Sequence, residues 1–486
     1  MISPKRSILK GNFFSGVRWM VFSSLVFLYA YLPLTLLAVF LSPRRWQNLV
    51  LLVASLLFYG WGEPLYILLM IATFTAAYLF GFPIARNRSS HPARARLWTI
   101  LSASVSLSAL FFFKYYDFTA ATLSRLPFRN IPLLGLRLPI GISFYTFQIL
   151  SYTVDLYRGD ADLQRNYVSF GAYVALFPQL IAGPIVRYRE IDGQLRDRRT
   201  TAADFSAGVE RFCVGLSKKV LLGDPLASGY VYFRDAVSLD PSALGAWMSV
   251  ILYSLHLYFD FSGYSDMAIG LGRMLGFRFP ENFDYPYTAG SIREFWRRWH
   301  LTLSGWFRTY VYIPLGGNRK GRRKQLRNLA AVWLLTGLWH GANWNFILWG
   351  CYYFVLLAAE HFLLRDRLDG IPLPLRRAGT LLLVFLGFLL FSEPDLPTVG
   401  HTLRALVSFG CPIALPTDLY RLLTLLPLLA LAAIGSTPLP RRWFACLTDR
   451  HPRARWLRPA LCGFALLLST AYLADSSFSP FEYLNF

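Results

Sequence analysis

Long runs of apolar residues, separated by short polar or basic loops, recur along the whole chain. The first four runs cover residues 20–41, 46–60, 65–85 and 98–113, and the fourth stops at Lys114. An uncharged apolar run of about 18 residues or more is long enough to cross a membrane as an α-helix. The pattern therefore predicts an all-α, polytopic membrane protein with roughly 10–12 transmembrane or re-entrant helices.

The later segments are less regular. Residues 138–157 again have the length of a span, whereas residues 167–186 are apolar but interrupted by Pro178, Gly183 and Pro184. Irregular backbone at membrane depth is tolerated only where protein buries it or where it lines a wet cavity. We therefore expect this interrupted segment to enter and leave on one face. The remaining apolar segments are 203–224 (amphipathic), 241–272, 328–359, 375–391, 403–414, 420–436 and 456–473.

The basic loops predict the orientation. The loops at 42–45 and 86–96 are rich in arginine and are separated by two spans, so they share a side. That side should be cytosolic, because cytosolic loops carry an excess of Lys and Arg. Residues 1–19 would then face outward, although they are basic. The simplest interpretation is that translation begins at Met20, and the alternative is a genuine basic leader that opposes the orientation.

Composition agrees with a membrane protein and excludes other classes. Hydrophobic residues make up 55% of the 486 residues and charged residues only 16%, whereas soluble domains carry about 25% charged residues. The five cysteines show no metal or disulfide spacing, so no metal is expected. The positive-inside bias accounts for the net charge of +22, so we infer membrane lipid and no nucleic acid as a partner. Residues 20–486 are expected to form one integrated membrane domain, with a motif-bearing core at 138–350.

His340 is the most informative single residue. It lies near the middle of a run from Asn328 to Ala359 that contains no Asp, Glu, Lys or Arg. A charge at such depth costs on the order of 2.5–3.5 kcal/mol or more, so ionisable groups there usually face a cavity and have a function. Gly337 and Gly341 flank it and permit close approach of backbone or of a ligand. The alternative is a neutral imidazole that bonds two helices together.

Other polar residues indicate a functional site less strongly than His340 does. His300 closes the aromatic and basic stretch 295–300, where it is either functional or a packing partner at a membrane border. His256 and Asp260 are four residues apart and share a helix face, and we favour a structural pair over a catalytic one. The alternation of aromatic and small polar residues over 258–266 predicts a polar pocket inside the bundle.

The basic tract at 319–327 is explained better by lipid headgroups than by the phosphates of a cytosolic donor. No nucleotide-binding loop, metal-binding motif or nucleophile elbow occurs in the sequence.

A set of short motifs points to a known family. They occur at residues 139–145 (Pro-Ile-Gly-Ile-Ser-Phe-Tyr), 177–184 (Phe-Pro-Gln-Leu-Ile-Ala-Gly-Pro), 258–270, 295–304, 312–321 and 337–341 (Gly-Leu-Trp-His-Gly). On these motifs the chain resembles the membrane-bound O-acyltransferases, in particular the bacterial branch typified by the membrane subunit of alginate O-acetylation.

The resemblance implies a ring of helices around a tunnel that connects the cytosol with the outside. It implies that His340 is the catalytic histidine, acting as general base, and that His300 is the second family histidine, orienting or binding the donor. It further implies acetyl-CoA as the acetyl donor with no bound cofactor, and an exported polysaccharide such as alginate or cellulose as the final acceptor. A periplasmic acetyltransferase and a polysaccharide secretion complex would be partners, at the bacterial inner membrane.

The finer assignments stay open. Arg297, Arg298 and Asn343 are candidates for donor binding, and the oxyanion would be met by Asn343, Asn345 or backbone N–H groups near Gly341. The chain departs from the related sequences at Thr309, where they usually have Asp. The alternatives are an exporter of D-alanyl or another acyl group for a cell-wall polymer, and a non-catalytic transporter. A transporter usually shows repeated halves, which this sequence lacks.

Overall fold

The computed structural model describes residues 20–126 and 130–475, so the leader expected at residues 1–19 lies outside the described residues. Within these ranges the regular elements are helices, accompanied by one isolated bridge between Phe283 and Trp299. The predicted all-α class is therefore confirmed.

The α-helices follow one another along the chain in three groups. The first group is α1 (Leu32–Leu41), α2 (Arg44–Gly62), α3 (Tyr66–Asn87), α4 (Pro92–Leu110), α5 (Tyr116–Leu123), α6 (Ile142–Arg158), α7 (Tyr167–Ala175) and α8 (Phe177–Leu180). The second group is α9 (Tyr188–Arg196), α10 (Ala202–Ser217), α11 (Asp224–Leu239), α12 (Ala243–Met274), α13 (Ile292–Trp296), α14 (Leu301–Phe307), α15 (Arg322–His340) and α16 (Trp344–Ala359). The last group is α17 (Arg365–Leu368), α18 (Leu373–Ser392), α19 (Leu396–Leu406), α20 (Pro416–Gly435), α21 (Leu439–Arg450) and α22 (Leu457–Asp475).

Short π-helical and 3₁₀ turns extend or link several of these helices. The π-helical turns are η1 (Phe27–Tyr31), η2 (Phe111–Tyr115), η3 (Lys218–Gly223), η5 (Arg308–Tyr312) and η6 (Glu360–Leu364), and the 3₁₀ turns are η4 (Pro286–Thr288) and η7 (Pro452–Trp456). A π-helical turn inside an α-helix is often found at a functional site.

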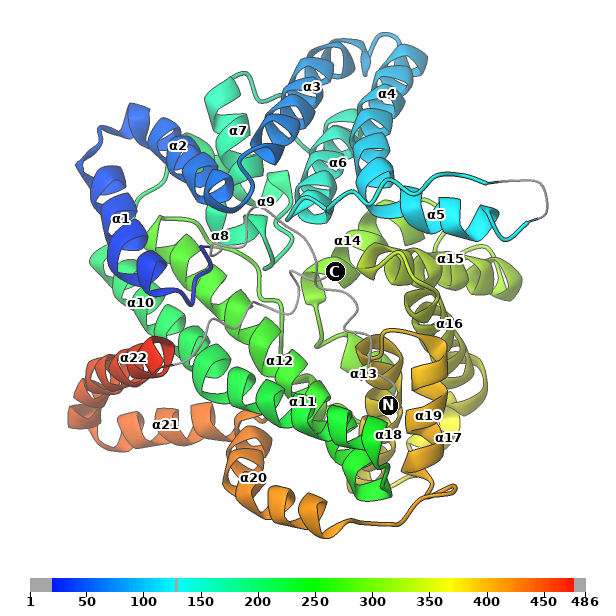
Figure 1. Ribbon diagram of the computed structural model, residues 1–486. Coiled ribbons are helices and arrows are strands. Elements are labelled where there is room, and N and C mark those ends of the chain that lie inside the picture. Colours follow the sequence, from blue (N-terminus) through cyan, green and yellow to red (C-terminus); the bar gives the residue numbers. More distant parts are fainter. Residues whose placement is uncertain (1–19, 127–129, 476–486) are drawn as a thin grey trace, which may run out of the picture.

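The long helix α12 runs through the centre of the molecule (Figure 1), with α10 and α11 packed along it. In Figure 1, α3, α4, α6 and α7 gather at one side of α12, and α15, α16, α18 and α19 gather at another. Helices α20, α21 and α22 lie at the periphery, where α20 contacts α11 and α22 contacts α10.

Six helical stretches in the described residues are long and apolar enough to cross a membrane, which confirms a multi-pass membrane protein. They are Tyr66–Asn87, Pro92–Leu123, Trp344–Leu364, Leu373–Ser392, Pro416–Gly435 and Leu457–Asp475. Large apolar side chains such as Leu68, Leu423 and Leu467 are exposed on them. A broad exposed apolar surface of this kind is expected to face lipid.

Two glycine pairs bring the backbones of α10 and α12 into direct contact. A Cβ atom on Gly215 would lie 2.5 Å from the carbonyl oxygen of Gly263, and one on Gly270 would lie 2.6 Å from that of Gly208. Only glycine permits this approach, because any side chain would overlap the neighbouring backbone.

The polar residues of α12 bind its neighbours. Asp266 accepts hydrogen bonds from Arg211 and Lys218, and Asp260 forms an ion pair with Lys219 at 3.4 Å. His256 lies 2.9 Å from the carbonyl oxygen of Gly223 through Nδ1. These contacts agree with a structural role for His256 and Asp260. The residues at 258–266 are all buried on α12, and the polar pocket expected there stays a prediction.

The interruption predicted within 167–186 is confirmed, because this segment forms α7 and α8, which are separated at Leu176. The charge-free run 328–359, whose length suits one long or two short segments, forms two: the end of α15 and the whole of α16. The span predicted at 241–272 is a single helix, α12.

Two predicted boundaries are wrong. The fourth span does not stop at Lys114, because α4 continues through η2 and α5 to Leu123. The apolar stretch 403–414 is not a span, because α19 ends at Leu406 and Ser408 and Gly410 adopt positive φ angles of 56° and 75°. The chain after them caps α12, since the backbone N–H groups at 243 and 244 donate to the carbonyls at 412 and 413.

Candidate functional site

His340 is the last residue of α15. The helix ends there because Gly341 is extended and α16 begins at Trp344. A Cβ atom on Gly337 would lie 2.3 Å from the carbonyl oxygen of Phe346, on α16. Gly337 therefore permits the close contact between α15 and α16. The group that approaches it closely, as the sequence predicted, is the backbone of α16.

Aromatic rings enclose the His340 side chain, and the residue is only 4% exposed. The imidazole lies edge-to-face against Trp339, Trp349 and Phe391, with ring centroids 4.9, 5.1 and 5.2 Å apart. An apolar wall of this kind disfavours a charged imidazole, because a buried charge without a counter-ion is costly. The surroundings therefore suit a neutral base.

His300 lies at the start of α14 and is 1% exposed. Its backbone is left-handed, with φ 47° and ψ 54°, a conformation that costs a residue with a side chain about 1–3 kcal/mol. Such a backbone conformation persists when the surrounding groups hold it in place. The group that fixes this one is Asn282, whose backbone carbonyl accepts from the N–H of Leu301.

Asn282 also determines the tautomer of His300. Its Nδ2 donates to Ser265 Oγ at 3.0 Å, and its Oδ1 accepts from Thr302 Oγ1 at 2.9 Å. Because His300 Nδ1 lies 3.0 Å from the same Oδ1, this nitrogen must carry the proton. Nε2 then holds the lone pair, and among the described residues it has no hydrogen-bond partner. A buried acceptor of this kind is available to a bound molecule.

The structure brings the two histidines together on one tryptophan. The Trp339 ring centroid is 6.0 Å from that of His300 and 4.9 Å from that of His340. Phe144 and Phe147, on α6, pack against the same indole. Two histidines from separate helices thus share one buried aromatic site.

A small cavity of about 30 Å³ opens beside the end of α15. Its walls are Lys114, residues 138–144, Ile181, Trp339 and His340. This volume has room for about one or two water molecules. The cavity is therefore an opening toward His340 and too small for a whole substrate in this state.

The three candidate donor-binding residues are not gathered in this cavity. Arg297 is exposed. Arg298 donates to Glu294 and to Thr288, and Asn343 donates to the carbonyl of Pro394 at 3.1 Å. The buried amide of Asn345 likewise donates, at 2.7 Å, to the carbonyl of Glu393. Both asparagine amides thus hold the segment after α18.

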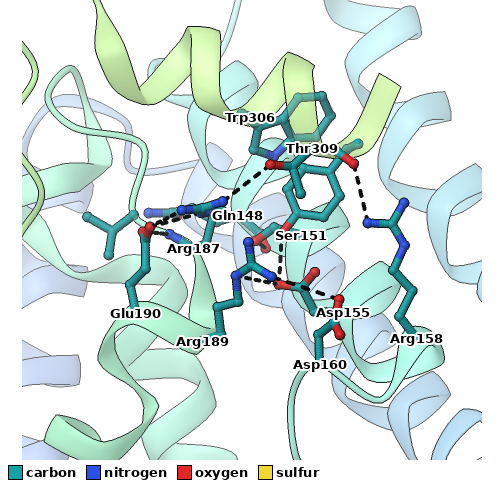
Figure 2. A network of polar contacts seen from close by, with 12 residues as sticks. Gln148, Ser151, Asp155, Arg158, Asp160, Arg187, Arg189, Glu190, Trp306 and Thr309 are labelled. Atoms are coloured by element: carbon teal, nitrogen blue, oxygen red, sulfur yellow. Dashed lines mark hydrogen bonds and ion pairs between the residues drawn. The ribbon is translucent and has the colours of Figure 1, made fainter. Parts of the chain in front are cut away.

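A second polar region contains Thr309 (Figure 2). Arg158 donates to the Thr309 carbonyl at 3.3 Å, and Arg187 donates to its hydroxyl at 3.4 Å. Arg187 also forms an ion pair with Glu190. Burial disfavours charge on Arg187, but the bond to Glu190 outweighs it and raises the pKa of the guanidinium.

The same region continues around Asp155, which is inaccessible to solvent. Its Oδ2 accepts from the Tyr310 hydroxyl at 2.7 Å and lies 3.8 Å from Arg189, which is also 3.8 Å from Asp160. We call Asp155, Arg158, Asp160, Arg187, Arg189, Glu190 and Thr309 the arginine cluster (Figure 2).

A larger open basin, of about 1570 Å³, lies at the turn between α3 and α4 and contains neither His300 nor His340. Its basic lining residues are Arg86, Arg88, His91, Arg94, Arg165 and Arg196. This arrangement suits phosphate groups of lipid at the membrane surface. Across the described parts of the chain, no group of three or more His, Cys, Asp or Glu side chains could hold a metal ion.

Two residues at the site were missed by sequence reasoning. Lys114 was taken as the end of a span, although a single lysine among Phe111, Phe112, Phe113, Tyr115 and Tyr116 could have signalled a buried charge. Asn282 gave no signal, because it lies in a loop and its contacts with α12 and α14 are distant in sequence.

Comparison with known proteins places this site in context. The model of the membrane-bound O-acyltransferase family matches residues 136–366. A probable alginate O-acetylase of Azotobacter vinelandii is 44% identical over 80% of this chain and 79% of its own length. The corresponding protein of Pseudomonas putida is 41% identical over 96% of this chain and 100% of its own. The peptidoglycan O-acetyltransferase of Helicobacter pylori is 36% identical over 70% of each chain.

Proposed function

Since this chain belongs to the membrane-bound O-acyltransferase family, we propose that it moves acetyl groups from a cytosolic thioester to an exported polysaccharide. Membership confirms the resemblance carried by the motifs, and the protein is a membrane-embedded acyltransferase. The acetyl group and the polysaccharide are supported by two relatives described as probable alginate O-acetylases and by one described as a peptidoglycan O-acetyltransferase. Alginate or cellulose is the proposed acceptor, and acetyl-CoA is the proposed donor.

The meeting of His300 and His340 at Trp339 is the observation that carries the proposal. In our mechanism the imidazole of His340 accepts the proton of an acceptor hydroxyl while the hydroxyl oxygen attacks the thioester carbonyl. The carbon–sulfur bond then breaks, and the leaving thiolate takes the proton from the imidazolium. The base returns to its neutral form, which the aromatic enclosure favours.

His300 has a different task in this mechanism. Its Nε2 is a buried acceptor, so it orients the donor by accepting a hydrogen bond from an N–H or O–H group of that molecule. Arg297, which is exposed, remains the best placed of the three candidate donor-binding residues to meet a phosphate, since Arg298 and Asn343 are engaged within the protein.

The cellular setting follows from the same proposal. The protein would lie in the bacterial inner membrane and pass acetyl groups to a periplasmic acetyltransferase within a polysaccharide secretion complex. Arginines around the open basin would contact anionic lipid headgroups.

The test uses purified protein in lipid vesicles that receive acetyl-CoA labelled in the acetyl group. We expect His340→Ala to lower label transfer or hydrolysis by at least about 100-fold, because general base catalysis contributes that much or more. His401→Ala, at an exposed position on α19, is the matched control and should behave as wild type. Polymer-bound acetate in cells should fall in parallel, at normal membrane levels of the protein.

Other results of this experiment would reject His340 as the base or favour a different function. Unchanged transfer by His340→Ala would reject His340 as the base and direct attention to His300. Transfer only from a carrier-protein thioester would favour the D-alanyl type of exporter. Saturable flux of an intact solute, without acyl transfer, would favour a transporter.

A further inference from the structure

Lys114 lies inside an apolar helical stretch that is long enough to cross the membrane, Pro92–Leu123. It belongs to the π-helical turn η2 and is only partly exposed. A lysine in such surroundings is expensive, and it usually persists because its charge is used. The proposed mechanism leaves it without a task, although it lines the cavity beside His340.

The ammonium group of Lys114 binds the end of the helix that carries His340. Its Nζ donates to the carbonyl of Trp339, and it lies 3.4 Å from the carbonyl of His340 and 3.4 Å from Ser143 Oγ. The next residue, Tyr115, donates its hydroxyl to the carbonyl of Leu338 at 2.8 Å. Two consecutive residues of η2 therefore bind three consecutive carbonyls at the end of α15.

These carbonyls need such partners. The last carbonyls of an α-helix have no partner within the helix, and they form the negative end of the helix dipole, which favours a cation. Lys114 supplies both a hydrogen-bond donor and a cation. Gly341 provides little alternative support for these carbonyls, because its backbone is extended and α15 ends at His340.

Lys114 also contacts the residue that joins the two histidines. Its Nζ lies 5.9 Å from the centroid of the Trp339 ring, over its face. Within residues 20–126 and 130–475, no carboxylate forms an ion pair with it, so its bonds go to neutral oxygens. One ammonium group from another helix thus contacts both the Trp339 ring and the backbone at His340.

We propose that Lys114 is a positioning residue that holds the end of α15, so that the His340 imidazole keeps its place for proton transfer. This inference rests on the proposed function, because it acts through His340. Loss of the ammonium group would let the end of α15 shift. A misplacement of about 1 Å at a reacting group can lower the rate about 100-fold.

The experiment compares acetyl transfer by Lys114→Met, Lys114→Gln and Lys114→Arg, in the full chain in lipid vesicles. We expect Lys114→Met to lower kcat about 100-fold, with KM for acetyl-CoA changed less than about 2-fold. Lys114→Arg should recover much of the loss, because it restores a cationic donor. Tyr115→Phe, which removes only the neutral bond to Leu338, is the matched control and should lose less than about 10-fold.

A double variant distinguishes positioning from a general structural role. If Lys114 acts through His340, Lys114→Met should not lower the residual rate of His340→Ala any further. A purely structural role would instead lower the amount of folded protein and its melting temperature, and leave kcat per folded molecule unchanged. A wild-type kcat in folded Lys114→Met, or an additive loss in the double variant, would overturn the inference.

A second variant and a comparison with His340→Ala distinguish the possible outcomes. If Lys114→Met fails to accumulate in membranes, Lys114→Gln decides, since it keeps N–H donors but no charge, and a wild-type kcat there would also overturn the inference. Full activity of His340→Ala would reject the proposed function, whereas loss in His340→Ala together with a fully active Lys114→Met would reject only the role of Lys114.

Discussion

The histidine site is buried, whereas the arginine cluster is partly exposed, and the two polar regions are built in opposite ways. His300 and His340 lie among aromatic rings, and the few hydrogen bonds at the site set positions, such as that of Asn282 to His300. In the arginine cluster, charges meet charges, with Asp155 between Tyr310 and Arg189. The difference teaches that apolar rings in the first region favour neutral imidazoles, while ion pairs in the second hold helices and loops together.

The largest loss of acetyl transfer is expected when α15 and α16 are forced apart at the histidine site. Gly337→Ala places a Cβ atom where the Phe346 carbonyl oxygen is 2.3 Å away. Overpacking of this kind costs about 1–3 kcal/mol, and displacement of His340 should lower transfer about 100-fold. Gly379→Ala, where a Cβ meets nothing within 4 Å, is the matched control. A fully active Gly337→Ala would show that the histidine site tolerates movement.

The next largest loss of activity is expected when Asn282, which holds His300 in place, is replaced. Asn282→Ala leaves Ser265, Thr302 and His300 Nδ1 without their partner, and each such loss in a buried place costs about 1–3 kcal/mol. We expect kcat to fall about 10- to 100-fold, measured as label transfer per folded protein. Asn282→Asp keeps an acceptor for Nδ1 and should retain more activity. Equal loss in both variants would contradict the assigned tautomer.

In the arginine cluster, substitution should affect stability more than catalysis. Asp155→Ala deprives Tyr310 and Arg189 of a buried acceptor and should lower the free energy of unfolding by about 1–3 kcal/mol. The effect is seen as a lower melting temperature, with kcat of the folded protein changed by less than about 3-fold. Asp160→Ala, whose side chain is 48% exposed, is the control and should cost less than about 1 kcal/mol. A large loss of kcat in Asp155→Ala would remove the contrast between the regions.

The smallest effect on stability is expected from placing an acidic residue at 309, where the sequence resemblance led us to expect Asp. Thr309→Asp would place a carboxylate near Arg158 and Arg187. A partly exposed ion pair contributes about 0–1 kcal/mol and is screened by salt. We expect a small rise in melting temperature at low ionic strength that disappears at high ionic strength. A lower melting temperature at low salt would show that Glu190 already satisfies Arg187.

Much of the fold could be predicted, because hydrophobic runs report directly on helices in a membrane. The long helix α12 follows from the apolar pattern, whereas the run around His340 suited one long or two short segments and breaks at Gly341. The same pattern failed at Lys114, since a hydropathy boundary does not show whether a lysine points to water or caps another helix. It failed again at 403–414, where left-handed residues and a proline override the apolar composition.

The site was only partly predictable. His340 and His300 were identified from sequence, and the structure places both on Trp339. Their roles as base and as donor-orienting group remain predictions. Asn282 was missed because its contacts are long-range. The amide of Asn343 binds the carbonyl of Pro394, after α18, and its role in donor binding stays a prediction. Sequence spacing does not record such contacts.

The cap on α12 has a consequence for how the protein is made. The first N–H groups of this central helix donate to the carbonyls at 412 and 413, far later in the sequence. Ser242 is tied in the same way to Asp418, at the start of α20. A chain still emerging from the ribosome therefore inserts its central helix with an open end. Closure waits until the chain has been synthesised as far as Asp418, because the partners of this helix start lie at 412, 413 and 418.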